Sequence, residues 1–133
     1  MHARGARHFR REIAMLVEVG TTGDLNPGAM KEVRIDGREL LLARVGDDYL
    51  VADNRCPHLN GVLSQGRLDG SVVTCPRHGS RFDLTDGRVV RWTGEGLIGR
   101  PGVISTLSKL LKPPRPLRVY IVKTEDGKIL AEL

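Results

Sequence analysis

Two short motifs in the sequence each combine one cysteine with one histidine. The first is Cys56-Pro57-His58, the second is Cys75-Pro76-Arg77-His78, and sixteen residues separate His58 from Cys75. The chain has only two cysteines, and both lie in these motifs. Thiolate and imidazole are soft and borderline ligands, which suit zinc or iron–sulfur chemistry and bind magnesium or calcium poorly. The two motifs therefore predict a metal centre.

Three interpretations of these four residues are open at this point. The cysteines could be buried apolar residues beside incidental histidines. The four side chains could form a tetrahedral structural zinc site, although a zinc finger places its two cysteines together and its two histidines together. They could also hold a [2Fe–2S] cluster in which two cysteines bind one iron and two histidines bind the other.

The segments CPHLNG (residues 56–61) and CPRHGSRFDLTDG (residues 75–87) resemble the Rieske pattern in ligand types, internal spacings and the length of the gap. The resemblance covers residues 15–91 and resumes at residues 116–133. The chain looks like a soluble, oxygenase-associated Rieske-type ferredoxin. This implies one Rieske-type [2Fe–2S] cluster and one-electron transfer from a ferredoxin reductase to a terminal oxygenase or another redox enzyme. The implied fold is three small antiparallel sheets, with the cluster held at the tip of two loops.

The resemblance also implies a role for each ligand. Cys56 and Cys75 would bind the buried iron. His58 and His78 would bind the outer iron, near solvent.

Departures from the quinol-oxidising Rieske proteins are equally informative. Those proteins carry a disulfide between the two loops, but this chain has Gly61 and Arg77 at the two positions, so no bridge forms there. They also place a serine and a tyrosine to donate hydrogen bonds to the cluster. Here Ser80 is present and Phe82 replaces the tyrosine, so we expect a potential in the lower half of the Rieske range.

Short β-rich runs surround the two motifs. Asp-Gly, the strongest two-residue hairpin signal, occurs at residues 36–37, 69–70, 86–87 and 126–127. The predicted strands are residues 31–35, 39–45, 49–52, 66–68, 71–74, 82–84, 88–92, 117–124 and 128–133. Strands at this spacing predict an all-β, antiparallel sandwich or barrel.

Two segments do not fit this strand pattern. Residues 1–14 read as a flexible basic extension, with Met15 as an alternative start, so the Rieske domain is predicted over residues 15–133. Residues 93–116 read as an insertion with a short amphipathic helix, because Ile104, Leu107 and Leu111 recur at helical spacing. The insertion could be functional, or it could cover one open end of the sandwich.

Composition limits the remaining choices. The 133 residues fit one domain, and no apolar run approaches the length of about 18 residues that a membrane span needs. Few cysteines and no export signal predict a cytoplasmic protein. Residues 88–118 hold seven basic residues against Glu95, a charge that could face an acidic protein partner or anionic lipid, or could simply be a solvated surface. Nucleic acid is disfavoured, because this segment has one stacking aromatic residue and no binding motif.

The sequence offers no second active site beyond the two motifs. Outside them, the only histidines are in the basic extension, so we expect an electron-transfer protein rather than an enzyme. Two alternatives remain open here: an accessory subunit of a nitrite-reductase-like complex, and a zinc-stabilised interaction module.

Overall fold

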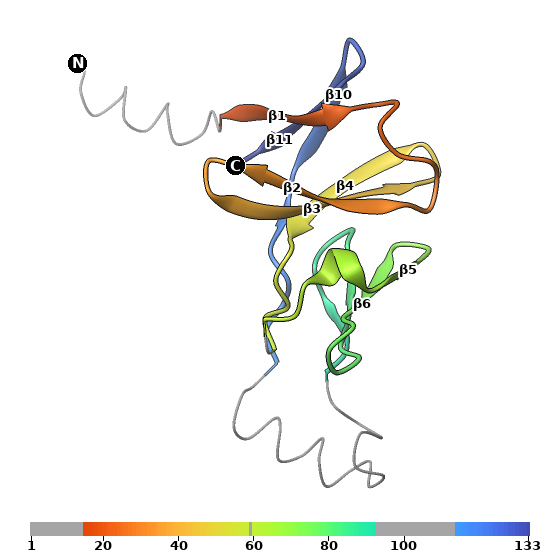
Figure 1. The fold of residues 1–133 in the computed structure, drawn as a ribbon, viewed down its shortest axis with the longest axis vertical. Helices are drawn as coiled ribbons and strands as arrows, with labels where there is room; N and C mark the ends of the chain where they lie inside the picture. Colours follow the sequence, from red (N-terminus) through yellow and green to blue (C-terminus); the bar gives the residue numbers. More distant parts are fainter. Residues whose placement is uncertain (1–14, 59, 93–113) are drawn as a thin grey trace, which may run out of the picture.

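The computed structural model describes residues 15–58, 60–92 and 114–133. Three antiparallel sheets follow one another from top to bottom in Figure 1. The terminal sheet has the order β1 (Leu16–Thr21), β11 (Lys128–Glu132) and β10 (Val122–Glu125). The central sheet has the order β2 (Met30–Ile35), β3 (Arg38–Val45), β4 (Asp48–Asp53) and β9 (Val119–Tyr120). The small sheet has the order β5 (Arg67–Asp69), β6 (Val72–Thr74), β7 (Arg81–Asp83) and β8 (Val89–Arg91).

Strand β3 explains how the three sheets hold together. Residues 40–43 are all fully buried, and successive side chains on a strand point to opposite faces. Leu41 and Ala43 belong to a core shared with the small sheet, whereas Leu40 and Leu42 belong to a core shared with the terminal sheet. The continuous apolar sequence of β3 is therefore explained by burial of the strand on both faces. These observations confirm the predicted all-β fold of three small antiparallel sheets.

The last predicted strand, residues 117–124, is divided in the structure. Strand β9 pairs with β4 of the central sheet, whereas β10 pairs with β11 of the terminal sheet. Ile121 lies between them and is 66% exposed. The prediction of one continuous strand was wrong, because the chain changes sheets at Ile121. The pairing of β1 with β11 was not predicted either.

The four Asp-Gly pairs form two kinds of turn. Both residues have positive φ at residues 36–37 and 126–127, as a type I′ hairpin turn requires. At residues 69–70 and 86–87, only the glycine has positive φ. The short hairpin between β5 and β6 turns at Gly70-Ser71, because Asp69 is still paired with Val72. The turn signal was correct in all four places, but two of the turn types were not.

Gly87 connects the small sheet to the chain before β9. A side-chain Cβ at this position would lie 2.0 Å from the carbonyl oxygen of Leu117, and φ is +83°. The amide of Leu117 donates to the carbonyl of Gly87 at 2.8 Å. Glycine is therefore required here, because two backbones meet without room for a side chain.

Several predicted features lie outside the described residues. These are the basic extension at residues 1–14 and the amphipathic helix within residues 93–116, of which the structure describes residues 114–116 only. The domain bounds of 15–133 stay a prediction. In the described part of the chain, the single helical element is a 3₁₀ turn at Leu63–Gln65, and no helix is long and apolar enough to cross a membrane.

Candidate metal centre

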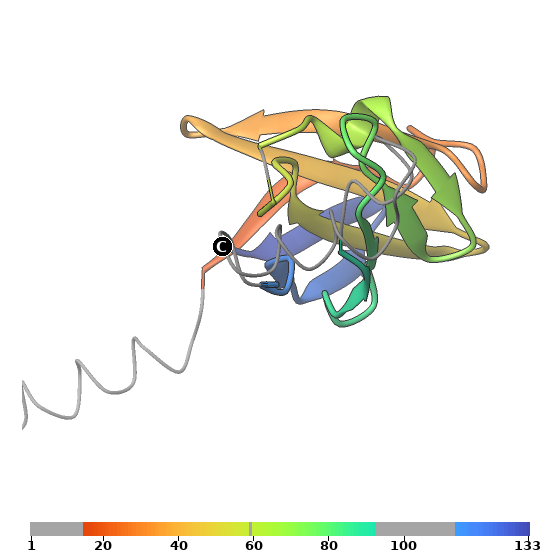
Figure 2. The same ribbon diagram turned by 90° about the horizontal axis from the view of Figure 1, so that it is seen from below.

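Both cysteine–histidine motifs lie in loops at one end of the molecule. The first loop (residues 54–62) follows β4, and the second loop (residues 75–80) joins β6 to β7. The two loops point to the lower end of Figure 1 and face the viewer in Figure 2, where they are yellow-green and green.

The two loops have the same backbone hydrogen-bond pattern. In the first, the amide of Cys56 donates to Gly61 O at 2.8 Å, and the amide of Asn60 donates to Cys56 O at 2.8 Å. In the second, the amide of Cys75 donates to Ser80 O at 2.8 Å, and the amide of Gly79 donates to Cys75 O at 3.1 Å. Asn60 and Gly79 both have positive φ, at 64° and 83°. Each cysteine therefore begins an equivalent tight turn, although the spacing to its histidine differs.

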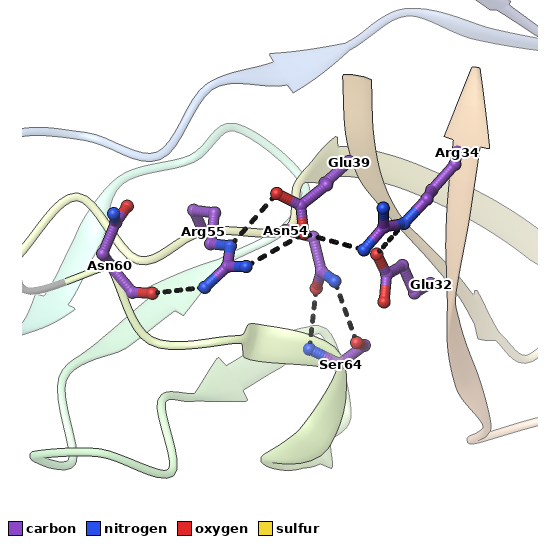
Figure 3. Close-up of polar contacts among 7 residues, drawn as sticks. All are labelled: Glu32, Arg34, Glu39, Asn54, Arg55, Asn60 and Ser64. Carbon is purple, nitrogen blue, oxygen red and sulfur yellow. Dashed lines mark hydrogen bonds and ion pairs between the residues drawn. The ribbon is translucent and has the colours of Figure 1, made fainter. Parts of the chain in front are cut away.

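A buried asparagine fixes the start of the first loop. Asn54 is fully buried, its side-chain oxygen accepts from the amide of Ser64 at 2.8 Å, and its side-chain nitrogen donates to Ser64 Oγ at 3.0 Å (Figure 3). The amide of Leu63 donates to the carbonyl of Asn54. This ties the strand that enters the loop to the 3₁₀ turn that leaves it.

An arginine clamps the first loop from the outside. Arg55 contacts both carboxylate oxygens of Glu39 on β3, at 3.3 and 3.1 Å, and donates to the carbonyl of Asn60 at 3.1 Å (Figure 3). Hydrogen bonding from Arg55 is the main cause that lowers the pKa of Glu39 below its ordinary value. The contact joins the loop to the central sheet, although exposed ion pairs contribute little free energy individually.

The two loops touch at Gly61. A Cβ at this position would lie 2.5 Å from Cys75 Sγ and 3.1 Å from Arg77 Cβ. Gly61 and Arg77 are the two positions at which the resemblance placed the disulfide of other Rieske proteins. The structure brings these positions together, and glycine makes the close approach of the loops possible.

The thiols form a buried pair. Cys56 and Cys75 are 2% and 3% exposed, and neither is in a disulfide. The pKa of Cys75 is lowered to about 6, mainly by a hydrogen bond from Cys56 and then by the backbone N–H groups of Arg77 and His78. Donors aimed at a sulfur favour its thiolate form, which is the form that binds metal.

The imidazoles form a second pair. The His58 and His78 rings lie 5.8 Å apart and nearly perpendicular. His58 is buried at 6% exposure, with the Trp92 ring 4.7 Å away, whereas His78 is half-buried. His78 Nδ1 is buried and has no hydrogen-bond partner within the structure. A buried, unpartnered ring nitrogen needs an explanation, and a metal ligand supplies one.

The four candidate ligands divide into two pairs. Within residues 15–58, 60–92 and 114–133, no three His, Cys, Asp or Glu side chains converge on a point that could hold a single ion. The four side chains instead form a thiol pair and an imidazole pair. A [2Fe–2S] group with two sulfur and two nitrogen ligands needs this division.

Comparison with protein families gives the decisive observation. The family described as the Rieske [2Fe-2S] domain matches residues 15–100. The chain belongs to this family.

Several proteins similar to the chain are ferredoxins of oxygenase systems. The ferredoxin component of biphenyl 2,3-dioxygenase from Rhodococcus jostii (strain RHA1) is 27% identical over 89% of the chain and 92% of its own length. The ferredoxin component of the naphthalene 1,2-dioxygenase system from Pseudomonas putida is 32% identical over 56% of the chain and 71% of its own length. The solved ferredoxin of carbazole 1,9a-dioxygenase from Nocardioides aromaticivorans IC177 is 27% identical, with a TM-score of 0.69 over 89% of the chain and 97% of that structure.

This Rieske protein therefore carries one [2Fe–2S] cluster and transfers single electrons, rather than catalysing a reaction itself. The two alternatives considered from the sequence, an accessory subunit and a zinc module, give way to this function. Among the predicted tuning residues, Ser80 and Phe82 are both fully buried, and Ser80 O pairs with the amide of Cys75.

Sequence reasoning missed two residues of this site. Trp92 follows β8 of the small sheet. Its ring contacts the His58 ring and lies 6.4 Å from the Phe82 ring, perpendicular to it. Asn54 precedes the first motif and fixes its loop. Neither residue belongs to a spacing pattern, so only the fold could show that they lie at the site.

Proposed function

We propose that this Rieske ferredoxin passes electrons from a ferredoxin reductase to the terminal oxygenase of an oxygenase system. Support comes from the biphenyl and naphthalene dioxygenase relatives, which are ferredoxin components. One chain in a solved complex of reduced oxygenase and oxidised ferredoxin of carbazole 1,9a-dioxygenase is 26% identical to this chain, with a TM-score of 0.66. The observation that carries the proposal is the thiol pair and the imidazole pair on two equivalent loops.

We assign the four ligands within the same proposal. Cys56 and Cys75 bind one iron, and His58 and His78 bind the other. When bound, the cluster accepts and releases one electron. The buried thiols, with backbone N–H groups aimed at the sulfur of Cys75, stabilise negative charge on that side.

The two histidines have different roles toward the partner. Trp92 covers His58, whereas the half-buried His78 keeps an edge open to solvent. A docked partner can therefore approach His78 directly. We assign His78 as the side of the site that faces the reductase and the oxygenase in turn.

Metal analysis and spectroscopy test this function. The purified protein should contain two irons and two sulfides per chain and give a Rieske-type EPR signal after dithionite reduction. The reduced protein should then lose its electron to a terminal oxygenase that is mixed with it anaerobically. Zinc without sulfide would contradict the cluster, and a reduced protein that no oxygenase reoxidises would contradict the proposed role.

A cytoplasmic location belongs to the proposal as well. Its support is that the two cysteines are not joined in a disulfide, as expected for a protein of a reducing compartment. Fractionation of cells that express the full chain, followed by immunodetection, tests it.

A further inference from the structure

An open groove lies beside the first loop. It has a volume of about 600 Å³, and its walls come from the first loop on one side and residues 115–118 on the other. Arg55, Cys56 and Pro57 lie on the loop side, and Arg115 and Arg118 lie on the opposite side. We call this feature the basic groove.

The hollow next to the basic groove extends the same surface. It shares Arg55, Arg118 and Asp53 with the groove and adds Arg38, Glu39 and Tyr120. The guanidinium groups of Arg38 and Arg118 lie 5.5 and 5.3 Å from the Tyr120 ring centre. Four arginines from three separate parts of the sequence therefore share one surface, which the charge of residues 88–118 alone did not predict.

The acidic groups at this surface are already engaged. Asp53 accepts a hydrogen bond from the Tyr120 hydroxyl at 2.5 Å, and Glu39 pairs with Arg55 at 3.1 Å. Arg115 and Arg118 are both exposed and have no acidic partner among the described residues. Their charges are available to an anion from outside the chain.

The chemistry of the groove favours carboxylates over nucleic acid. Guanidinium groups bind carboxylates through two parallel hydrogen bonds, and contact with an aromatic ring holds Arg118 in place. Binding of single-stranded nucleic acid relies on bases stacking against open aromatic faces. Tyr120 is the aromatic residue at this surface, and two arginines already lie over its ring.

We propose that the basic groove is the docking site for a carboxylate-rich segment of the protein that exchanges electrons with this chain. The proposal rests on the proposed function, because Cys56 and Pro57 line the groove and a segment bound there holds its protein against the first loop. The partner is thus defined by its chemistry: an acidic surface beside its own redox centre.

Matched variants of the cluster-loaded full chain test the proposal. R115Q with R118Q removes two charges from the groove, and R115K with R118K keeps them. K123Q with K128Q removes two charges from the β10–β11 hairpin, which lies at the opposite end of the molecule in Figure 1. The probe is acetylated, amidated hexaglutamate, and its binding is measured by titration calorimetry at low ionic strength.

The wild type and the hairpin variant should bind hexaglutamate alike, whereas R115Q with R118Q should bind it at least about fivefold more weakly. The lysine pair should bind between these two, because it keeps the charges but loses the two parallel hydrogen bonds of each guanidinium group. Binding should weaken further as salt is added, because the exposed charges are screened. Equal losses in the groove and hairpin variants would mean that only net charge matters, and would overturn the proposal. Inorganic phosphate that displaces the peptide at equal concentration would identify a small-anion site instead, and would also overturn it.

The visible and EPR spectra of each variant separate this proposal from the proposed function. An R115Q, R118Q protein with an intact Rieske signal and weak peptide binding supports the groove. A normal signal with unchanged peptide binding overturns the groove and leaves the electron carrier intact. A wild-type protein without a Rieske signal contradicts the proposed function, whatever the peptide does.

Discussion

Hydrogen-bond donors surround the sulfur of Cys75. The Cys56 thiol and the backbone N–H groups of Arg77 and His78 donate to it, and they lower its pKa to about 6. When Cys56 is itself a thiolate ligand its proton is lost, and the two backbone donors remain. Such donors stabilise negative charge at the sulfur more strongly as that charge grows. The donors around Cys75 therefore stabilise the negative charge that its sulfur carries as an iron ligand, in the oxidised and in the reduced cluster.

Replacing either cysteine should abolish the metal centre. Cys56→Ser or Cys75→Ser removes one thiolate, and metal binding contributes directly to folding because no preformed site exists in the unfolded chain. We expect iron content near zero and a thermal midpoint lower by about 10 °C or more, since 1 kcal/mol is worth about 4 °C at this size. Iron analysis and calorimetry check both. A Cys56→Ser protein with full iron and normal stability would refute the ligand assignment.

Two substitutions at the tuning residues should shift the potential in opposite directions. Phe82→Tyr adds a hydroxyl that can donate to a ligand sulfur, and Ser80→Ala removes one. A hydrogen bond that favours the reduced state by about 1 kcal/mol corresponds to roughly 40 mV for one electron. We therefore expect a rise of that size for Phe82→Tyr and a fall for Ser80→Ala, measured by voltammetry.

The burial of Phe82 defines the opposing outcome. This side chain is fully buried against Trp92, so a hydroxyl that finds no acceptor would cost about 1–3 kcal/mol of stability. Unchanged potential together with lower stability would show that the ring edge does not face the cluster. A downward shift would contradict the hydrogen-bond argument itself.

How far the site can be read from the sequence differs from residue to residue. Cys56, His58, Cys75 and His78 are recognisable because ligand chemistry demands those types at short spacing. The contacts of Trp92 with His58 are not recognisable, because they depend on where β8 ends relative to the first loop. Local chemistry leaves a signal in the sequence, and contacts between distant segments do not.

At the level of the elements, the site is one structural unit used twice. The tight turn in each loop starts with a cysteine, and the residue four positions after that cysteine has positive φ. Asn60 and Gly79 occupy equivalent positions in the two turns. The histidines do not, because His58 follows its cysteine by two residues and His78 follows its cysteine by three. The two loops then meet at Gly61, where the spacing between them is set by backbone rather than by side chains.

Gly61→Ala should therefore separate the loops. Its new Cβ would lie 2.5 Å from Cys75 Sγ, and overpacking of this kind costs about 1–3 kcal/mol. We expect strongly reduced iron content and lower thermal stability. Gly23→Ala is the matched control, because nothing lies within 4 Å of a Cβ there and its φ is not positive. Full iron in Gly61→Ala would mean that the loops move apart at little cost.

The hairpin turns could be predicted from the sequence, whereas the break within the last predicted strand could not. Asp36-Gly37 and Asp126-Gly127 form the expected hairpins, because short-range turn chemistry decides them. The break at Ile121 was invisible, because residues 117–124 have strand-forming residues throughout. The break arises from competition between two sheets for the same segment, which is a property of the fold and not of the segment.

At the scale of the whole molecule, a hydrogen bond between two side chains links parts of the chain that are distant in sequence. Tyr120 on β9 donates to Asp53 at the end of β4, 67 residues away in sequence, just before the first loop begins. Burial first, and then Asp53, raise the pKa of Tyr120 above its usual 10. The folded protein therefore favours the neutral hydroxyl.

This contact should make stability fall at alkaline pH. Because the folded pKa is raised, the contribution is fully present below about pH 10 and is lost as pH rises through the folded value. Tyr120→Phe should cost about 1 kcal/mol at pH 8, and its difference from wild type should shrink above pH 10. Denaturant unfolding of both proteins from pH 8 to 11 measures this. A constant difference across the range would show that the pKa of Tyr120 is the same in the folded and unfolded states.

Trp92 is the single tryptophan of the chain, and its position gives the protein a built-in optical reporter. The indole ring lies 4.7 Å from the His58 ring and is 5% exposed. An iron–sulfur cluster absorbs light across the range in which indole emits, so emission from Trp92 should be quenched when the cluster is in place. Cluster insertion and loss can then be followed in real time by intrinsic fluorescence, without any added label.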